Sequence, residues 1–74
     1  MDKKTMEALK LIVDAARRTK DGYVMCVELP IKNSDERKTI CDELESCGYI
    51  SKVEPFGRKY IRCQVEQAAY EAVE

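Results

Sequence analysis

The fold of this chain is decided by one stretch, ESCGYISKVEPFGRKYIRCQVE, which runs from Glu45 to Glu66. The stretch contains a helix end, a strand, a turn and a second strand. Pro55 and Gly57 are turn residues, because proline presets φ and glycine accepts the left-handed conformation. We therefore predict a hairpin with strands Tyr49–Val53 and Lys59–Val65 around the turn sequence EPFG.

The second strand of this hairpin alternates between apolar and polar side chains. An alternation of period two predicts a strand with one buried face and one solvated face. The predicted buried set is Ile61, Cys63 and Val65, and the predicted solvated set is Tyr60, Arg62 and Gln64. We expect the first set to face the helices.

A helix precedes the hairpin, at about Ser34–Cys47. Asn33 is the predicted N-cap, with Glu36 three residues later as in a capping box, and Ser34 is the alternative cap. Gly48 is the predicted C′ residue of a Schellman motif. The predicted buried face is Ile40, Cys41, Leu44 and Cys47.

The chain begins with another amphipathic helix, which Asp2 can cap and which Asp21-Gly22 is expected to stop. Arg17, Arg18 and Lys20 then lie near its end, where cations suit the helix dipole. One apolar stripe is formed by Met6, Leu9, Ile12, Val13 and Ala16, and a second by Ala8, Leu11 and Ala15. This helix thus has more apolar surface than one small sheet needs.

Two further segments complete the pattern. Tyr23–Leu29 is a predicted strand, with Tyr23, Met25, Val27 and Leu29 on one face and Val24 and Cys26 on the other. Because both faces are mostly apolar, we expect other parts of the protein to pack against both sides of this strand. The acidic end, EQAAYEAVE, is a candidate for a short helix, which needs docking to be stable.

The predicted fold is a small α+β domain over residues 1–74, in the order α-β-α-β-β with a possible C-terminal helix. Two helices cover one face of a three-stranded antiparallel sheet. The helix ICDELESCGYI followed by the hairpin SKVEPFGRKYIRCQV resembles the winged-helix family. That resemblance implies a wing hairpin and a further helix between the first strand and the recognition helix, where this chain has only Pro30–Asn33.

Composition excludes several kinds of chemistry. The chain has 74 residues, no histidine and a net charge of −1. Without histidine there is no Ser-His or Cys-His pair, and the sequence has no glycine-rich phosphate loop. We therefore expect no enzyme, no cofactor and no small-molecule substrate. No apolar run reaches membrane-spanning length and no secretory signal is evident, so we expect a cytoplasmic protein without a membrane partner.

Four cysteines are the candidate metal ligands. Zinc sites in small domains use close cysteine pairs, whereas here the gaps between successive cysteines are 14, 5 and 15 residues. Free cysteine behaves as a small buried hydrophobe. We therefore predict reduced, structural thiols and no metal site. The cysteines are Cys26, Cys41, Cys47 and Cys63.

Charge is divided between the hairpin and the helix before it. Tyr49–Val65 carries four cations against one carboxylate, whereas Asn33–Gly48 carries five carboxylates against two cations. A basic wing suits phosphate contacts, but a recognition helix of net charge −3 would be repelled from the major groove. The candidate contact residues of the wing are Lys52, Phe56, Arg58, Lys59, Tyr60 and Arg62. Phe56, at the expected turn tip, either contacts a partner or packs back onto the hairpin.

The function expected from the sequence is that of a non-catalytic binding module. We favour association with a protein, including a homodimer through the spare apolar surface of the first helix and the C-terminal segment. The candidate residues for self-association are Ala8, Leu11, Ala15 and Tyr70. The alternative is wing-led, weakly specific binding of DNA or RNA, because phosphate contacts carry no base information.

Overall fold

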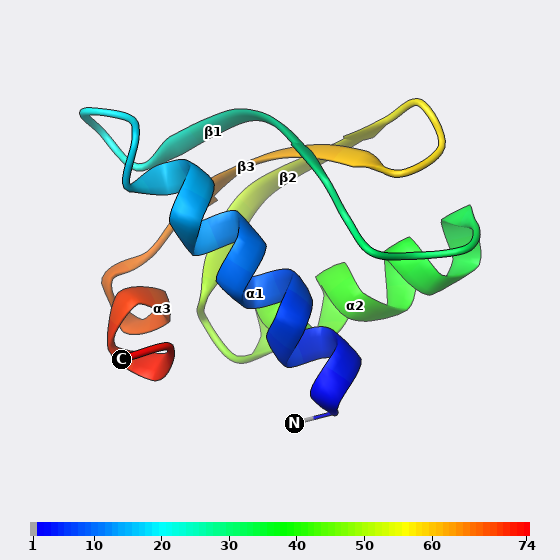
Figure 1. The fold of residues 1–74 in the computed structure, drawn as a ribbon, viewed down its shortest axis with the longest axis horizontal. Helices are drawn as coiled ribbons and strands as arrows, with labels where there is room; N and C mark the ends of the chain where they lie inside the picture. Colours follow the sequence, from blue (N-terminus) through cyan, green and yellow to red (C-terminus); the bar gives the residue numbers. More distant parts are fainter. Residues whose placement is uncertain (1) are drawn as a thin grey trace.

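The structure is a computed structural model that describes residues 2–74 (Figure 1). It confirms the predicted α+β class and element order, and the C-terminal segment forms the short helix. The elements are α1 (Lys3–Ala16), β1 (Tyr23–Glu28), α2 (Ser34–Ser46), β2 (Ile50–Phe56), β3 (Tyr60–Val65) and α3 (Gln67–Ala72).

The sheet is antiparallel throughout, in the order β1-β3-β2, so β3 is central and the other two strands form its edges. Figure 1 shows α1 crossing one face of this sheet, with α2 on one side of the lower part of α1 and α3 on the other. All three helices contribute buried residues to a single core with the strands. The opposite face of the sheet has no helix over it in the part of the chain that the structure describes.

The alternation predicted for β3 is confirmed. Ile61 and Cys63 are fully buried and Val65 nearly so, while Tyr60 and Arg62 are exposed. Burying an aliphatic side chain of this kind contributes about 1.5–3 kcal/mol. The other fully or almost fully buried large side chains are Leu9, Ile12, Val13, Val24, Leu29 and Leu44.

Both edge strands carry a β-bulge beside the middle of β3. On β1 the register shifts between Val24 and Val27, and on β2 it shifts between Ser51 and Glu54. The bulge overturns the predicted alternation of β1, because Met25 and its neighbour Cys26 are both exposed. An extra residue in one strand moves the residues after it to the other face.

The ends of α2 form as predicted. The Asn33 side chain accepts a hydrogen bond from the Glu36 amide at 2.9 Å, so Asn33 is the N-cap. At the other end, the Tyr49 amide donates to the Leu44 carbonyl and the Gly48 amide to the Glu45 carbonyl, as in a Schellman motif. Gly48 has the left-handed φ of +78° that this motif requires.

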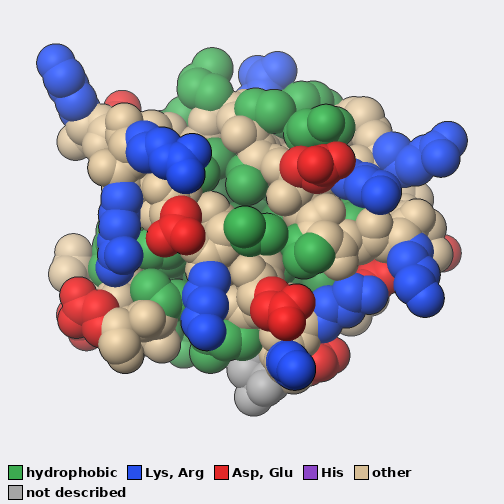
Figure 2. Space-filling view, viewed as in Figure 1, with side chains coloured by type: hydrophobic (Ala, Val, Ile, Leu, Met, Phe, Trp, Pro, Cys, Tyr) green, Lys and Arg blue, Asp and Glu red, His purple; other side chains and the backbone are tan. Residues whose placement is uncertain are grey.

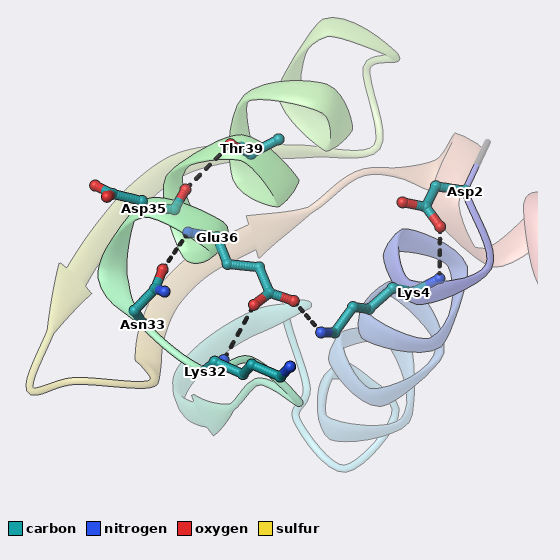
Figure 3. Close-up of polar contacts among 7 residues, drawn as sticks. All are labelled: Asp2, Lys4, Lys32, Asn33, Asp35, Glu36 and Thr39. Carbon is teal, nitrogen blue, oxygen red and sulfur yellow. Dashed lines mark hydrogen bonds and ion pairs between the residues drawn. The ribbon is translucent and has the colours of Figure 1, made fainter.

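Glu36 also joins α2 to α1 (Figure 3). Its carboxylate forms an ion pair with Lys4 and accepts a hydrogen bond from the Lys32 amide. The side-chain hydrogen bond from Lys4, followed by the Lys32 amide, lowers the pKa of Glu36. This acidic residue is therefore engaged in holding the two helices together.

The first helix ends earlier than predicted. It stops at Ala16, where the Thr19 hydroxyl donates to the Ala16 carbonyl at 2.8 Å and accepts from the Gly22 amide at 3.0 Å. Arg17 and Arg18 consequently lie at and beyond the end of the helix instead of in its last turn. A threonine side chain that bonds to nearby backbone offers the chain an alternative to further helix.

The hairpin turn also lies later than predicted. β2 continues through Pro55 to Phe56, which pairs with Tyr60, so the connection is Gly57-Arg58-Lys59. Proline is tolerated at this position because β2 is an edge strand and its missing N–H removes no hydrogen bond to β3. Phe56 is thus the last residue of a strand and not a turn tip.

Between β1 and α2 the chain has no helix, and every residue of this connection is described. Leu29 remains paired with the sheet through a hydrogen bond from its amide to the Lys59 carbonyl at 2.8 Å. Ile31 is buried. This connection is an ordered loop that leads directly from sheet to helix.

Candidate functional site: the open face of the sheet

The face of the sheet turned away from the helices, here called the open face, is built by the strand register. Residues directly opposite one another in antiparallel strands share a face. Tyr60 is flanked by Glu28 and Phe56, and Arg62 by Glu54 on one side. The open face consists of Tyr23, Met25, Cys26, Glu28, Ser51, Glu54, Phe56, Tyr60, Arg62 and Gln64.

The open face exposes much of the apolar surface that the fold leaves uncovered. Three large hydrophobic side chains are exposed among the described residues: Met25 at 63 %, Leu11 at 42 % and Tyr60 at 37 %. Two of these three, Met25 and Tyr60, belong to the open face. Figure 2 shows hydrophobic side chains along the edge of the molecule where Figure 1 draws β1. Grouped apolar exposure of this kind marks interaction surfaces more often than single exposed residues do.

The aromatic residues of the hairpin pack on one another. The rings of Phe56 and Tyr60 are stacked with centroids 5.8 Å apart, and the Arg62 guanidinium lies 5.1 Å from the centroid of Phe56. Of the two alternatives for Phe56, the structure shows packing onto the hairpin. Phe56 therefore supports the open face, while Tyr60 offers more of its ring to a partner.

Within the part of the chain that the structure describes, no carboxylate forms an ion pair with the hairpin cations Lys52, Arg58, Lys59 and Arg62. Among residues 2–74 the recorded ion pairs are those of Lys4 and Lys38, and neither involves the hairpin. Arg58 lies exposed on the turn beside half-buried Lys59, and Lys52 is exposed on the bulge of β2 with a left-handed φ of 53°. Figure 2 shows basic side chains at the edge of the molecule where Figure 1 draws this turn.

Arg37 of α2 fixes the turn in place. Its guanidinium donates to the carbonyls of Phe56 at 3.2 Å, Gly57 at 3.1 Å and Tyr60 at 3.4 Å. A carbonyl oxygen has two lone pairs, so Phe56 and Tyr60 can accept from Arg37 although they also pair with each other in the sheet. No local pattern predicts this contact, because in the sequence Arg37 resembles any other charged residue on a helix surface.

The self-association surface predicted on the first helix is largely absent. Ala8 is fully buried in the core, which corrects its assignment to a surface stripe. Ala15 and Tyr70 are half-buried and pack against the core, since α3 folds back beside α1. Leu11 alone of the four remains exposed, so the spare apolar surface lies elsewhere.

The four cysteines divide into two pairs. Cys41 and Cys63 are buried as predicted, and burial raises the pKa of their thiols to about 11 and about 12. Cys26 and Cys47 are exposed, which corrects the prediction that all four pack in the core. Among the described residues, no group of three or more cysteines and carboxylates is placed to hold a metal ion.

Comparison of the chain with protein-family models, curated proteins and solved structures found no match. Within residues 2–74, no helix has both the length and the apolar character needed to cross a membrane.

Proposed function

We propose that this protein is a non-catalytic binding module that associates with a second copy of itself through the open face. The observation that carries the proposal is the joint exposure of Met25 and Tyr60 on a sheet face that no helix within residues 2–74 covers (Figure 1). A small domain buries a smaller fraction of its surface than a large one, and self-association is a common way to bury the apolar side chains that remain exposed.

The charges of the open face suit a partner of the same kind. Arg62 lies opposite Glu54 on β2, and Glu28 lies one row away on β1. Two copies related by a two-fold axis would each present cations and carboxylates to the other, as an isologous interface requires. A face with only one sign of charge would oppose such pairing.

Light scattering across a concentration series tests this proposal. Met25→Glu places a charge on the open face, at its edge strand β1, and should abolish association. Leu11→Glu is the matched control, since it makes the same change at the exposed hydrophobic residue of α1. A protein that is monomeric at every concentration would overturn the proposal. Loss of association in Leu11→Glu but not in Met25→Glu would show that α1, and not the open face, forms the interface.

The second candidate function is nucleic-acid binding led by the hairpin, which the winged-helix resemblance suggests. Its specific support is that Arg58, Lys59 and Arg62 lack ion pairs with carboxylates of residues 2–74. Against base reading by α2, Asp35, Asp42 and Glu45 are exposed on that helix.

Fluorescence anisotropy with duplex and single-stranded probes tests this second candidate. Phosphate contacts would give affinity that falls steeply with salt. Replacing Arg58 and Lys59 with Ala should weaken binding to all sequences about equally and flatten the salt dependence. Absence of binding at low salt would remove nucleic acid as a partner.

A further inference from the structure

A groove lies on another part of the molecule, between α2 and the edge strand β2. Its volume is about 400 Å³. Its apolar lining, here called the floor, consists of Cys41, which is 5 % exposed, half-buried Val53 and exposed Pro55. The walls carry the polar residues Ser34, Asp35, Arg37, Lys38, Asp42 and Glu45. The groove thus combines an apolar floor with charged walls.

The two cations at this groove are already engaged. Arg37 donates to three carbonyls of the hairpin, and Lys38 pairs with Asp42 at 3.4 Å. Asp35 and Glu45 are exposed and form no recorded ion pair among residues 2–74. The groove lining holds three carboxylates and two cations, a net charge of −1, and the exposed carboxylates of Asp35 and Glu45 are the ones available to a ligand.

The negative charges of the groove act electrostatically on the thiol of Cys41 in its floor. Burial is the first cause of the raised pKa of Cys41, and the negative charge of Glu45 is the second. The positive charge of Arg37 acts in the opposite direction, and the negative charge of Asp42 adds a smaller increase. A cationic group seated above Cys41 would thus lie close to Glu45. Attraction between opposite charges is stronger beside an apolar floor than in open water.

Strand addition to β2 is blocked at this edge. Pro55 has no N–H to offer, and the bulge with Lys52 in the left-handed region interrupts the row of free backbone groups. Both features are devices that protect an edge strand from pairing with another strand. A ligand in the groove must therefore be held through its side chains.

We propose that this groove binds a segment of a partner protein in which an apolar side chain is flanked by lysine or arginine. The apolar side chain fills the floor over Val53 and Pro55. The flanking cations meet Glu45 and Asp35 on the walls. The site is separate from the open face, so it would let the module join a foreign partner while it self-associates.

Anisotropy of short fluorescent peptides with the full chain tests the groove. In the three peptides, leucine alternates with lysine, with glutamate or with serine. The lysine peptide should bind best and the glutamate peptide should not bind. Glu45→Lys should lower the affinity for the lysine peptide by about fivefold, because one exposed ion pair is lost and a repulsion between like charges is added.

Glu7→Lys is the matched control, because it makes the same charge change at an exposed position of α1 outside the groove. It should leave the affinity unchanged. Val53→Thr keeps the β-branched shape, places a hydroxyl in the floor and should also weaken binding. Met25→Glu should have no effect, so failure here is distinguishable from failure of self-association.

Three results would overturn the assignment. The first is equal binding of the three peptides, or no binding of any. The second is an equal loss of affinity in Glu7→Lys and Glu45→Lys, which would reveal a general charge effect. The third is unchanged affinity for the lysine peptide in Val53→Thr, which would show that the apolar floor takes no part in binding.

Discussion

The two faces of β3 are made of neighbouring residues but have opposite environments. Ile61 and Cys63 are fully buried beneath the helices, whereas Tyr60 and Arg62 lie on the open face. One alternation of six residues thus separates the surface that stabilises the fold from the surface available to a partner. The comparison implies that substitutions on the two faces should act on different properties of the protein.

The largest expected difference is in stability. Ile61→Ala removes a fully buried side chain from the central strand and should lower the free energy of unfolding by about 3 kcal/mol. Arg62→Ala, one residue away on the open face, should change it by no more than about 0.5 kcal/mol. Urea unfolding monitored by circular dichroism measures both. Similar losses for the two variants would mean that the faces are not separated as described.

Alkaline pH should distinguish the faces through their cysteines. The unfolded thiols ionise near pH 9.0, but burial raises the pKa of folded Cys63 to about 12. Above pH 9.0 the unfolded state therefore binds fewer protons than the folded state, and stability falls by up to about 1.4 kcal/mol per pH unit for one thiol.

The check is the pH dependence of unfolding in three proteins. Cys63→Ala should make the loss of stability above pH 9.0 less steep than in the wild type. Cys26→Ser, at an exposed position of the open face, should leave the slope unchanged. A change of slope in Cys26→Ser as large as in Cys63→Ala would contradict the burial assigned to the two thiols.

A smaller effect is expected at the end of the hairpin. Arg37→Ala removes hydrogen bonds to the carbonyls of Phe56, Gly57 and Tyr60. Two of these three bonds are exposed, so the loss should cost only about 1 kcal/mol of stability. Arg58→Ala, on the same turn but without such contacts, should cost little. Hydrogen exchange should show faster opening of the amides near Gly57 in Arg37→Ala alone. Equal exchange in both variants would show that Arg37 does not hold the turn.

Much of the fold followed from local signals in the sequence. The alternation of β3, the Asn33 cap and the Gly48 Schellman end each depend on a few neighbouring residues. Where local chemistry decides a structure, the sequence is sufficient to predict it.

The surfaces were less predictable because they depend on pairing between distant residues. The bulge that exposes Met25 and Cys26 arises from the register of β1 against β3, and no residue near it signals an extra residue in the strand. Ala8 is predicted at a surface but is fully buried, because helical spacing does not show how many elements pack around a helix. Leu11, in the same predicted stripe, is exposed as expected.

The most direct test of the open face as the self-association surface compares two exposed thiols in one protein. Cys26 lies on the open face beside Met25, whereas Cys47 caps the end of α2, so Cys47 serves as an internal control. The rate at which each thiol reacts with a maleimide is measured by mass spectrometry of peptides across a range of protein concentrations. The account predicts that Cys26 reacts more slowly as concentration rises while Cys47 does not. Rates that stay constant for Cys26, or that fall equally for both thiols, would contradict it.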